Sequence, residues 1–508
     1  MSKSEKRAFK LLAFRQGQEL PLFVQLFDCI ERHEDASDAF ILEQVPALSR
    51  QQLPNQKVFL YDYLLRSLHF STPRNLRAGE VNTLIEQCRI LYDKCLYSDC
   101  LRLVDKARRL ATQYGLNIQM LSVLEIEKQA IRHSISLHHE ARTVQNVNRS
   151  VHALQQESLA ARFHDFAVSL NVNYIRHGFP RNAAEVEEVR SWFKDHLPVH
   201  DAARLDVTSA MYAGYALTSY YLYIQDYRNS YRHAAKWLQL FTDAPYLQPE
   251  FTEMYIRALN SMLVVLNKLN DRERFAATHR ILVGLKRRKD IRLTENLRLN
   301  LFKAIYIHEI NYHYMTGEFR IGTRVVARLE AELDRFIPFL DHHSLLLFYY
   351  KIACLYFGAG NYRRALVWLG RITQGKDMEI RADLHAFARI LSLICHYELG
   401  NQRQLEANLK SLYRYLLKTD DLSAYNKLLL KFIRKLSATV PGARMKKSFE
   451  QLRTGMLALR RNRYELRAFY YFDIISWLDS KINGRTVEEV IKQKIRNAGV
   501  RPTRKRVQ

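Results

Sequence analysis

The apolar and small residues of 349–372, YYKIACLYFGAGNYRRALVWLGRI, recur at intervals of three and four and predict two helices joined by a turn. The pattern is carried by Tyr349, Ile352, Ala353, Tyr356, Ala365 and Leu369. Small side chains at Ala353 and Ala365 would let two antiparallel helices approach closely, while larger neighbours fill the space beside them. Gly360 lies between the two periodic runs and marks the turn. The stretch therefore predicts one packed helix pair.

Weaker copies of the same pattern occur at four other places along the chain: 92–107, 223–237, 314–329 and 397–412. The segment 266–275 fits one more copy, although its side-chain pattern is less clear. Three cysteines, Cys88, Cys95 and Cys100, fall in positions where the pattern requires a small residue. The spacing of the copies predicts an array of helix pairs with repeats of about 40–47 residues.

The order of large, apolar, small and aromatic positions in 349–372 resembles the tetratricopeptide pattern, W-x2-L-G-x2-Y followed by A-x3-F. The repeats in this chain are longer than the roughly 34 residues of that family. The resemblance implies an all-α fold, a right-handed superhelix (α-solenoid) of antiparallel TPR-like helix pairs. The segments KSEKRAFKLL, FLYDYLLRSL and LYDKCLYSDCLRLVDKA also resemble an uncharacterised family of ~500-residue bacterial helical proteins, which implies no activity.

In tetratricopeptide-like folds the first helix of each pair lines the concave surface, so the resemblance implies a groove for a protein or peptide partner. The candidate groove residues are Tyr212, Tyr215, Asn311, Tyr314, Tyr350, Phe357, Phe387 and Tyr397. This ridge carries no charge, which suits an amphipathic helix, and the absence of lysines argues against a clamp for an acidic peptide terminus. The alternative is that long helices wind the array tightly and bury the ridge as core.

Three domains are expected. Residues 1–80 have the spacing of short helices and form an N-terminal helical cap, with a DNA-reading module as the less favoured alternative. Residues 81–440 form the TPR-like array, and 441–508 form a basic C-terminal helical cap and tail. Within the last domain we expect one helix over 466–480, and Thr486 and Glu489 form a T-x-x-E capping box for a final helix.

Composition agrees with a mostly helical chain, because only 17 glycines and 11 prolines occur in 508 residues. The N-terminus lacks the apolar core of a signal peptide, and no apolar run approaches the roughly 18 residues of a membrane span. We therefore expect a cytoplasmic protein without a membrane span. The six cysteines lack the CxxC spacing of a zinc site, so free thiols are expected.

The net charge of +26 is unevenly distributed along the chain. Residues 422–508 carry 21 Lys and Arg against 6 Asp and Glu, which is more than half of the excess. Such a segment suggests an acidic partner or nucleic acid. The candidate polyanion contacts are Arg460, Arg461, Arg463 and Arg467, beside Tyr464. The alternative is a solvated basic stripe on an ordinary helix.

Candidate chemistry is sparse. His308, Glu309 and His313 come nearest to a metal motif, but histidines five residues apart diverge by about 140° on a helix. The chain has no phosphate loop, no dinucleotide glycine motif and no nucleophile elbow. We therefore expect no catalytic, cofactor-binding or metal site, and a non-enzymatic scaffold or adaptor for protein–protein interaction. The alternative is a nucleic-acid-binding protein that uses the basic C-terminal segment.

Overall fold

The computed structural model describes most of the chain, and every regular element that the described residues form is a helix. The described residues are 3–14, 21–33, 36–71, 76–133, 139–180, 182–374, 381–418, 423–437, 443–462, 465, 468–469 and 472–499. The chain divides into two compact units, Met1–Gln87 and Cys88–Gln508. The all-α prediction is confirmed, and no helix within the described ranges combines the length and apolar character that a bilayer crossing requires.

The first unit has a hydrophobic core of its own. Its helices are α1 (Lys3–Phe14), α2 (Leu22–Arg32), α3 (Asp38–Gln44) and α4 (Leu53–Ser71), and α5 (Arg77–Asp93) begins in it. The ring of Phe9 lies 4.6 Å from that of Phe27 and 5.9 Å from that of Tyr63, so α1, α2 and α4 meet around one aromatic centre. Ser37 caps α3 by accepting the Phe40 amide hydrogen at 3.3 Å.

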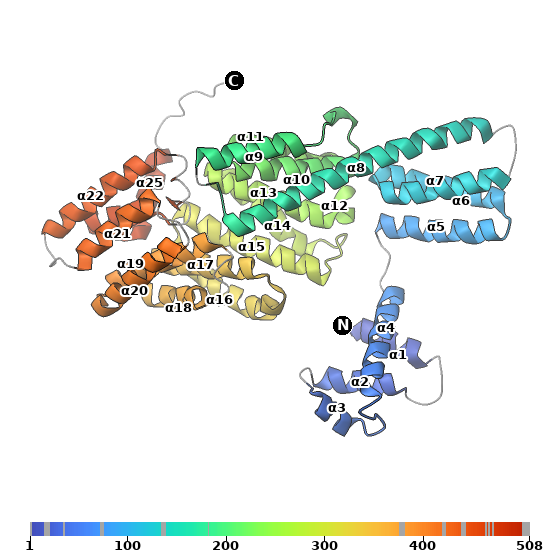
Figure 1. The fold of residues 1–508 in the computed structure, drawn as a ribbon, viewed down its shortest axis with the longest axis horizontal. Helices are drawn as coiled ribbons and strands as arrows, with labels where there is room; N and C mark the ends of the chain where they lie inside the picture. Colours follow the sequence, from blue (N-terminus) through green and yellow to red (C-terminus); the bar gives the residue numbers. More distant parts are fainter. Residues whose placement is uncertain are drawn as a thin grey trace. The chain divides into compact units, whose positions relative to one another are not determined.

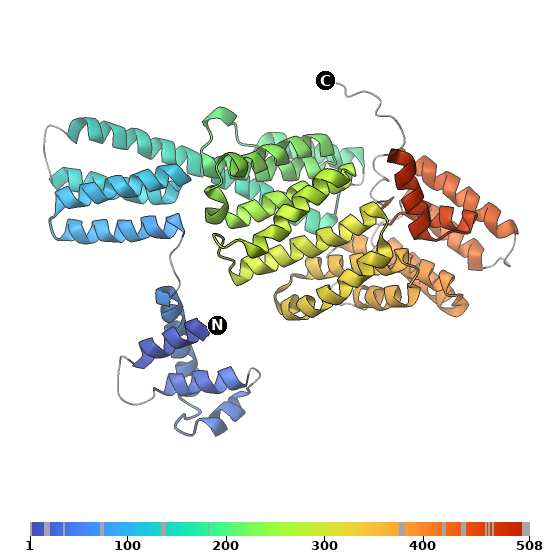
Figure 2. The ribbon, with the colours of Figure 1, turned by 180° about the vertical axis from the view of Figure 1, so that it is seen from behind.

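The second unit is a succession of packed neighbouring helices (Figure 1, and from behind in Figure 2). Its first part comprises α6 (Tyr97–Tyr114), α7 (Asn117–His133), α8 (His139–His177), α9 (Ala183–His196), α10 (Val207–Tyr223), α11 (Tyr227–Asp243), α12 (Leu247–Glu250), α13 (Thr252–Leu269) and α14 (Arg272–Gly284). The 39-residue α8 packs on α7 with its N-terminal part and on α10 with its C-terminal part.

The remaining helices continue the same alternation. They are α15 (Glu295–Thr316), α16 (Phe319–Phe336), α17 (His342–Gly358), α18 (Tyr362–Thr373), α19 (Ala382–Glu398), α20 (Gln402–Lys418), α21 (Ala424–Ser437), α22 (Ala443–Leu459), α24 (Ile474–Asn483) and α25 (Val487–Gly499). Short 3-10 turns occur at Ala202–Arg204, Leu285–Arg287 and Ile337–Phe339. Each helix packs mainly on its sequence neighbours, which is a solenoid-like arrangement.

Seven turns between consecutive helices of the described residues share one backbone geometry. In each, a residue with positive φ lies two positions before the second helix begins: Cys95, Gly115, Gln225, Asn270, Gly317, Gly360 and Gly400. This left-handed residue ends the first helix and lets the second return antiparallel. From Gln225 onward the turns are 40 to 47 residues apart, which matches the predicted repeat length. The turn at Asn270 identifies a repeat that the side-chain pattern only suggested.

The C-terminal helices share one core with the repeats rather than forming a separate one. Residues of α22 and α24 belong to the same buried cluster as residues of α15 to α20. The indole nitrogen of Trp477 in α24 donates to Glu398 of α19 at 2.7 Å, and Glu398 also pairs with Lys481 at 2.5 Å. The main-chain N–H of Arg320 donates to Glu488 of α25 at 3.0 Å. Packing therefore ties the last helices to the array at several points.

The local predictions for the C-terminal segment have different outcomes. The capping box is confirmed, because Thr486 N–H donates to Glu489 at 2.9 Å and Glu489 N–H donates to Oγ1 of Thr486 at 3.2 Å. The single helix expected over 466–480 is interrupted. Ala468 and Phe469 are helical, but Phe472 and Asp473 are not; Asp473 caps α24 by accepting the Ser476 amide hydrogen at 3.1 Å, so α24 begins at Ile474.

Candidate functional site

The eight candidate groove residues lie on α10, α15, α17 and α19, the first helices of their pairs, but most are core residues. Tyr215, Asn311, Tyr350, Phe357 and Phe387 are buried, whereas Tyr212, Tyr314 and Tyr397 are half-buried. This burial is what the alternative of a buried ridge expects. The role in partner binding that was predicted for these residues stays a prediction.

Aromatic residues of the C-terminal segment cover one end of this ridge. The ring of Phe472 lies 5.1 Å from that of Phe357, and the rings of Phe449 and Trp477 lie 6.2 Å and 6.3 Å from that of Tyr397. These rings come from α22, α24 and the segment between them. The ridge is therefore buried by a long-range contact that spacing within one repeat does not reveal.

A lysine lies within the ridge, although no lysine was expected there. Lys351 is the one Lys, Arg, Asp or Glu in α17. Its Nζ donates to Oδ1 of Asn311 in α15 at 2.6 Å and lies 5.5 Å from the ring centre of Tyr314. The Tyr314 hydroxyl donates to the main-chain carbonyl of Lys351. The sequence signal for this site was a single charged residue in an otherwise apolar helix. The groove residues were selected by their spacing alone, and that spacing does not include Lys351.

Arg381, just before α19, forms a second centre of charge. Its side chain is completely buried and donates to both carboxylate oxygens of Asp383, at 2.8 Å and 2.9 Å. One guanidinium nitrogen lies 3.3 Å from the hydroxyl of Tyr174 in α8 and 3.3 Å from Nδ1 of His343 in α17. The guanidinium also lies 5.0 Å from the ring centre of Tyr174. Residues far apart in sequence therefore meet at Arg381.

Lys268 of α13 completes this group, and we call Lys268, Lys351, Arg381 and Asp383 the inner basic cluster. Burial, with repulsion from Lys351 and Arg381, lowers the pKa of Lys268 to about 7. Burial lowers the pKa of Lys351 to about 8, with Cys354 opposing and Arg381 adding to the shift. The two lysines are nevertheless half-buried rather than buried, so each keeps accessible surface.

Two histidines beside the cluster have lowered pKa values. Burial and the charge of Arg381 lower the pKa of His343 to about 4. Burial, with smaller effects of His279 and Lys351, lowers the pKa of His308 well below its ordinary value. His308 lies 2.9 Å from Oδ1 of Asn260 and 3.4 Å from Nδ2 of Asn311, which places it in the same polar network as Lys351. These imidazoles contribute hydrogen bonds without adding charge.

The three residues that come nearest to a metal motif in sequence have separate partners. His308 faces Asn260 of α13, Glu309 pairs with Arg328 of α16 at 2.7 Å, and His313 lies 3.7 Å from Glu318. Among the residues that the structure describes, no three His, Cys, Asp or Glu side chains come together as metal ligands. The polar groups around Lys351 and Arg381 therefore offer positive charge and hydrogen-bond donors.

The predicted polyanion contacts are only partly described. Arg460 and Arg461 are exposed in the turn that follows α22, whereas Arg463 and Arg467 lie outside the described residues, as does Tyr464. Other basic residues of this segment take part in internal ion pairs. Arg453 and Lys494 both pair with Asp479, and Lys492 pairs with Glu488 at 2.6 Å. Part of the basic excess therefore holds the C-terminal helices together.

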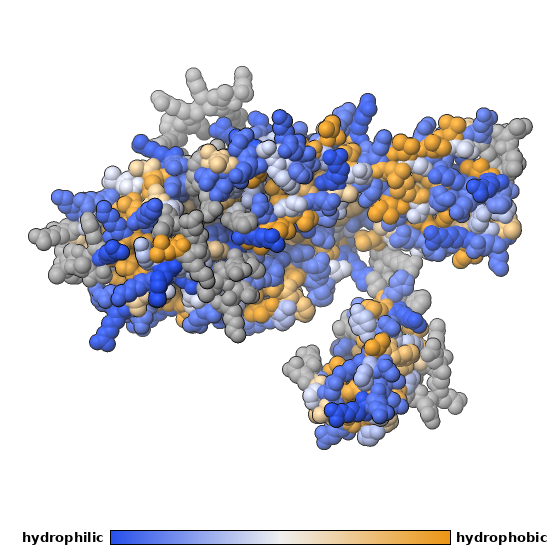
Figure 3. Space-filling view, in the orientation of Figure 1, coloured by the Kyte–Doolittle hydropathy of each residue, from blue (hydrophilic) through white to orange (hydrophobic). Residues whose placement is uncertain are grey.

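An exposed apolar stripe, which sequence reasoning missed, runs along the N-terminal part of α8. We call Val144, Val147, Val151 and Leu154 the α8 stripe; their side chains are 49% to 58% exposed. They are spaced i, i+3, i+7 and i+10, which is the a/d spacing of a coiled coil. Figure 3 shows hydrophobic surface over the region where α7 and α8 lie. The sequence signal was this heptad spacing in the N-terminal part of α8, where most of the other residues are polar.

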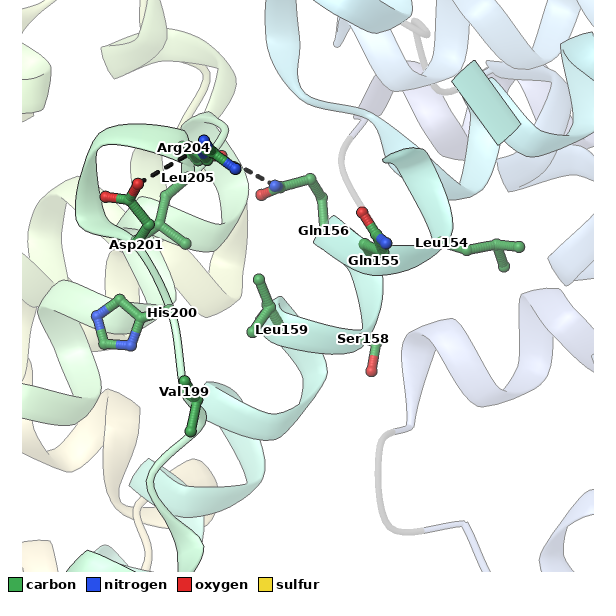
Figure 4. A pocket seen from close by; sticks show the side chains of 10 residues that line it. All are labelled: Leu154, Gln155, Gln156, Ser158, Leu159, Val199, His200, Asp201, Arg204 and Leu205. Atoms are coloured by element: carbon green, nitrogen blue, oxygen red, sulfur yellow. Dashed lines mark hydrogen bonds and ion pairs between the residues drawn. The ribbon is translucent and has the colours of Figure 1, made fainter. Parts of the chain in front are cut away.

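A shallow pocket of about 560 Å³ adjoins the end of the α8 stripe, between the α8 turn of Leu154–Leu159 and the segment Val199–Leu205 (Figure 4). Val199 at its rim is 96% exposed. Gln156 fixes the two walls, because its side-chain amide donates to the Arg204 carbonyl at 2.9 Å and accepts the Asp206 amide hydrogen at 3.0 Å. The pocket therefore continues the apolar surface of the α8 stripe onto the segment Val199–Leu205, which Gln156 holds against α8.

The chain matched no family model, no curated protein and no solved structure.

Proposed function

We propose that this protein is a non-enzymatic, TPR-like helical-repeat scaffold that binds an amphipathic helix of a protein partner along the α8 stripe. The observation that carries the proposal is the exposure of four aliphatic side chains at heptad spacing on one helix. A second helix with the same spacing can pack its own apolar residues between them. Partner binding would remove from water an apolar surface that folding alone leaves exposed.

The flanks of the stripe favour a partner with an apolar rather than a charged face. Asn148, Ser150 and Gln155, which occupy the positions beside the a/d residues, are all uncharged. Between Val144 and Gln155 a bound helix would therefore meet hydrogen-bonding groups at the edges of the contact, and the first charged flanking position, Glu157, follows the stripe. The specificity would come from shape and from apolar packing at the four stripe positions.

Buried ion pairs hold the stripe in place. On α8, Arg142 donates to Glu127 of α7 at 2.5 Å, and Asn146 donates to the same carboxylate at 2.9 Å. Arg142 also pairs with Asp105 of α6 at 2.8 Å. Since these contacts fix α8 against two helices, the stripe is presented on a rigid element and little conformational entropy is lost when a partner binds.

The test replaces the two central valines of the stripe. Val147→Ser combined with Val151→Ser removes apolar contact without adding charge, and Val168→Ser combined with Val172→Ser on the same helix is the matched control. We expect a partner that copurifies from nuclease-treated native extract to be lost with the first pair and kept with the second. Binding of the purified partner should weaken about tenfold or more.

Two outcomes would count against the proposal. Retention of the partner by the Val147/Val151 variant would show that the stripe is not the binding surface. A wild-type protein whose mass in solution is that of a dimer, and which becomes a monomer in this variant, would show that a second copy covers the stripe instead of another protein.

The alternative function, nucleic-acid binding, rests on Arg460 and Arg461. Both are exposed, and no ion pair to either is found among the described residues. Adjacent exposed guanidinium groups suit phosphate contacts. The salt dependence that would distinguish this function is set out in the Discussion.

A further inference from the structure

Helix α4 is apolar on two opposite faces, and the first unit covers only one of them. Leu60 and Tyr63 point into the core of this unit and are buried. Val58, Tyr61 and Leu65 lie on the opposite face, and we call these three residues the α4 stripe. Their side chains are 62%, 63% and 48% exposed. A helix with large apolar residues on both faces is normally covered on both, so one face of α4 lacks the cover that its sequence favours.

The aromatic residue of the α4 stripe has no specific contact with its own unit. Within the described part of the chain, the ring of Tyr61 stacks on no other ring and its hydroxyl forms no hydrogen bond. Phe59 differs, because its ring lies 5.0 Å from that of Phe23 and 6.0 Å from that of Tyr63. Single exposed apolar residues are ordinary on protein surfaces, whereas a contiguous group on one helix marks an interaction site.

The spacing of the α4 stripe is that of a helix that packs against another helix. Val58, Tyr61 and Leu65 are spaced i, i+3 and i+7, which corresponds to heptad positions a, d and a. On its covered face α4 packs on α1 and α2. The stripe therefore belongs to a fixed helix, and little conformational entropy is lost when a second helix binds.

The charges beside the stripe indicate that the second helix is α4 of another copy of this chain. Lys57 occupies position g and Asp62 position e, on either side of the stripe. In a parallel pair of helices, opposite charges at g of one helix and e of the next heptad on the other set partner and orientation. Asp62 follows Lys57 by the five residues that separate these positions, so two parallel copies of α4 would form two ion pairs. An antiparallel pair would place e beside e, where Asp62 would meet its own copy.

Both charges are accessible. Asp62 is exposed, and among the residues that the structure describes it forms no ion pair. Lys57 lies 2.5 Å from Asp38, but the two side chains keep 40% and 70% of their surface exposed. Because an ammonium group has three donors, Lys57 can keep Asp38 and bind a second carboxylate.

We propose that the α4 stripe is the interface of a homodimer, in which α4 of one copy packs on α4 of the other as a short parallel pair. Lys57 of each copy pairs with Asp62 of the other copy. Such a contact is two-fold symmetric, so every stripe residue contributes twice. Burial of the stripe supplies the affinity, whereas the ion pairs, which lie at the rim, mainly fix the orientation.

This interface differs in position from the surface proposed for the protein partner. The α4 stripe belongs to the first unit, whereas the α8 stripe belongs to the second. Substitutions in one stripe leave the other unchanged, so each proposal can fail while the other stands.

The experiment measures the mass of the full chain by sedimentation equilibrium from about 1 µM to about 200 µM. Val58→Ser combined with Leu65→Ser removes apolar contact without adding charge. Leu11→Ser combined with Ile30→Ser is the matched control, since these residues are 60% and 36% exposed on α1 and α2 of the same unit. We expect wild type and control to dimerise alike. The dissociation constant of the stripe variant should rise about a hundredfold or more, because each side chain is lost from both copies.

Charge reversal tests the pairing and the orientation. Lys57→Asp alone and Asp62→Lys alone each place like charges opposite one another in a parallel dimer, so each variant should dimerise about tenfold more weakly than wild type. Mixed in equal amounts, the two variants should form a heterodimer, because each reversed charge then faces an opposite charge on the other chain. A fluorescent label on one of the two variants detects the heterodimer.

Three results would overturn the proposal, provided that the variants keep the wild-type circular dichroism spectrum. The first is a wild-type chain that stays monomeric at the highest concentration, which would leave the α4 stripe to a different protein. The second is a dimer that persists in the Val58/Leu65 variant. The third is a mixture of the two charge variants that associates no better than either alone.

The variant that tests the α8 stripe separates the two proposals. Val147→Ser combined with Val151→Ser should leave the dimer intact, even where it abolishes partner binding. Loss of the dimer in that variant, with the dimer kept in the Val58/Leu65 variant, would assign the second copy to the α8 stripe and overturn the α4 interface.

Discussion

The Nζ atom of Lys351 lies 2.6 Å from Oδ1 of Asn311, so the one Lys, Arg, Asp or Glu of α17 bonds to a side chain of α15. These helices are the first members of two successive repeats, and the bond crosses a surface that is otherwise aromatic. A half-buried ammonium with neutral partners makes the stability of the protein depend on pH.

Stability should rise with pH between about 8 and about 10 because of Lys351. Its pKa in the folded protein is about 8, below the ordinary value of 10.5, so the unfolded chain binds more protons in this window. In Lys351→Met the free energy of unfolding should rise less steeply, by up to ~1.4 kcal/mol per pH unit. Urea unfolding of both proteins at several pH values from about 7 upward measures the difference. Parallel pH profiles would mean that Lys351 stays protonated throughout.

Glu127→Ala should destabilise the protein by about 1–3 kcal/mol, because it removes one of the two carboxylates that Arg108 and Arg142 share and leaves Asp105 as the other. Glu127 is completely buried and accepts from Arg108 at 2.7 Å and from Arg142 at 2.5 Å. Glu125→Ala on the same helix is the control, since Glu125 is exposed and its closest cation, Lys128, lies 3.7 Å away. The control should change stability by less than about 0.5 kcal/mol in the same urea titration. Equal losses in the two variants would contradict the role of the network.

Gly214→Ala should destabilise the pair α10 and α11 by about 1–3 kcal/mol. A Cβ atom there would lie 2.7 Å from both Cβ and Cγ of Trp237, which is buried and cannot move aside. Gly370→Ala within α18 is the control, because a Cβ atom there meets nothing within 4 Å. That variant should be more stable by roughly 0.5–1 kcal/mol, the helix preference of alanine over glycine. Thermal unfolding of the two variants should therefore shift in opposite directions.

The nucleic-acid alternative predicts an effect of Arg460→Glu combined with Arg461→Glu. If these residues contact phosphates, the affinity for a labelled duplex should fall, and the slope of log affinity against log salt should become less steep by about 2. Arg363→Glu combined with Arg364→Glu is the matched control, since these are also neighbouring exposed arginines. Fluorescence anisotropy at several salt concentrations measures both. Equal losses in the two variants would mean that binding follows net charge and not this site.

The repeat architecture follows from local features of the chain. Apolar spacing predicted the helix pairs, and Gly317, Gly360 and Gly400 occupy left-handed turns where a residue without a Cβ atom is least strained. The T-x-x-E box of Thr486 and Glu489 formed as expected, because both bonds lie within one helical turn. At Asn270 the turn has the same geometry without glycine. The sequence therefore gave only a weak indication of this turn, although the structure forms it as clearly as the others.

The sequence by itself determined the helices, their pairing and the length of the repeat, since these depend on backbone preferences and on spacing within a few turns of chain. Only the tertiary structure decided which surfaces are free. Phe472 and Trp477 pack on Phe357 and Tyr397 and bury the expected groove, whereas the α8 stripe stays exposed. The bond between Lys351 and Asn311 likewise exists only because packing brings α17 against α15. Exposure and the proximity of charges depend on contacts between distant segments, which local periodicity does not encode.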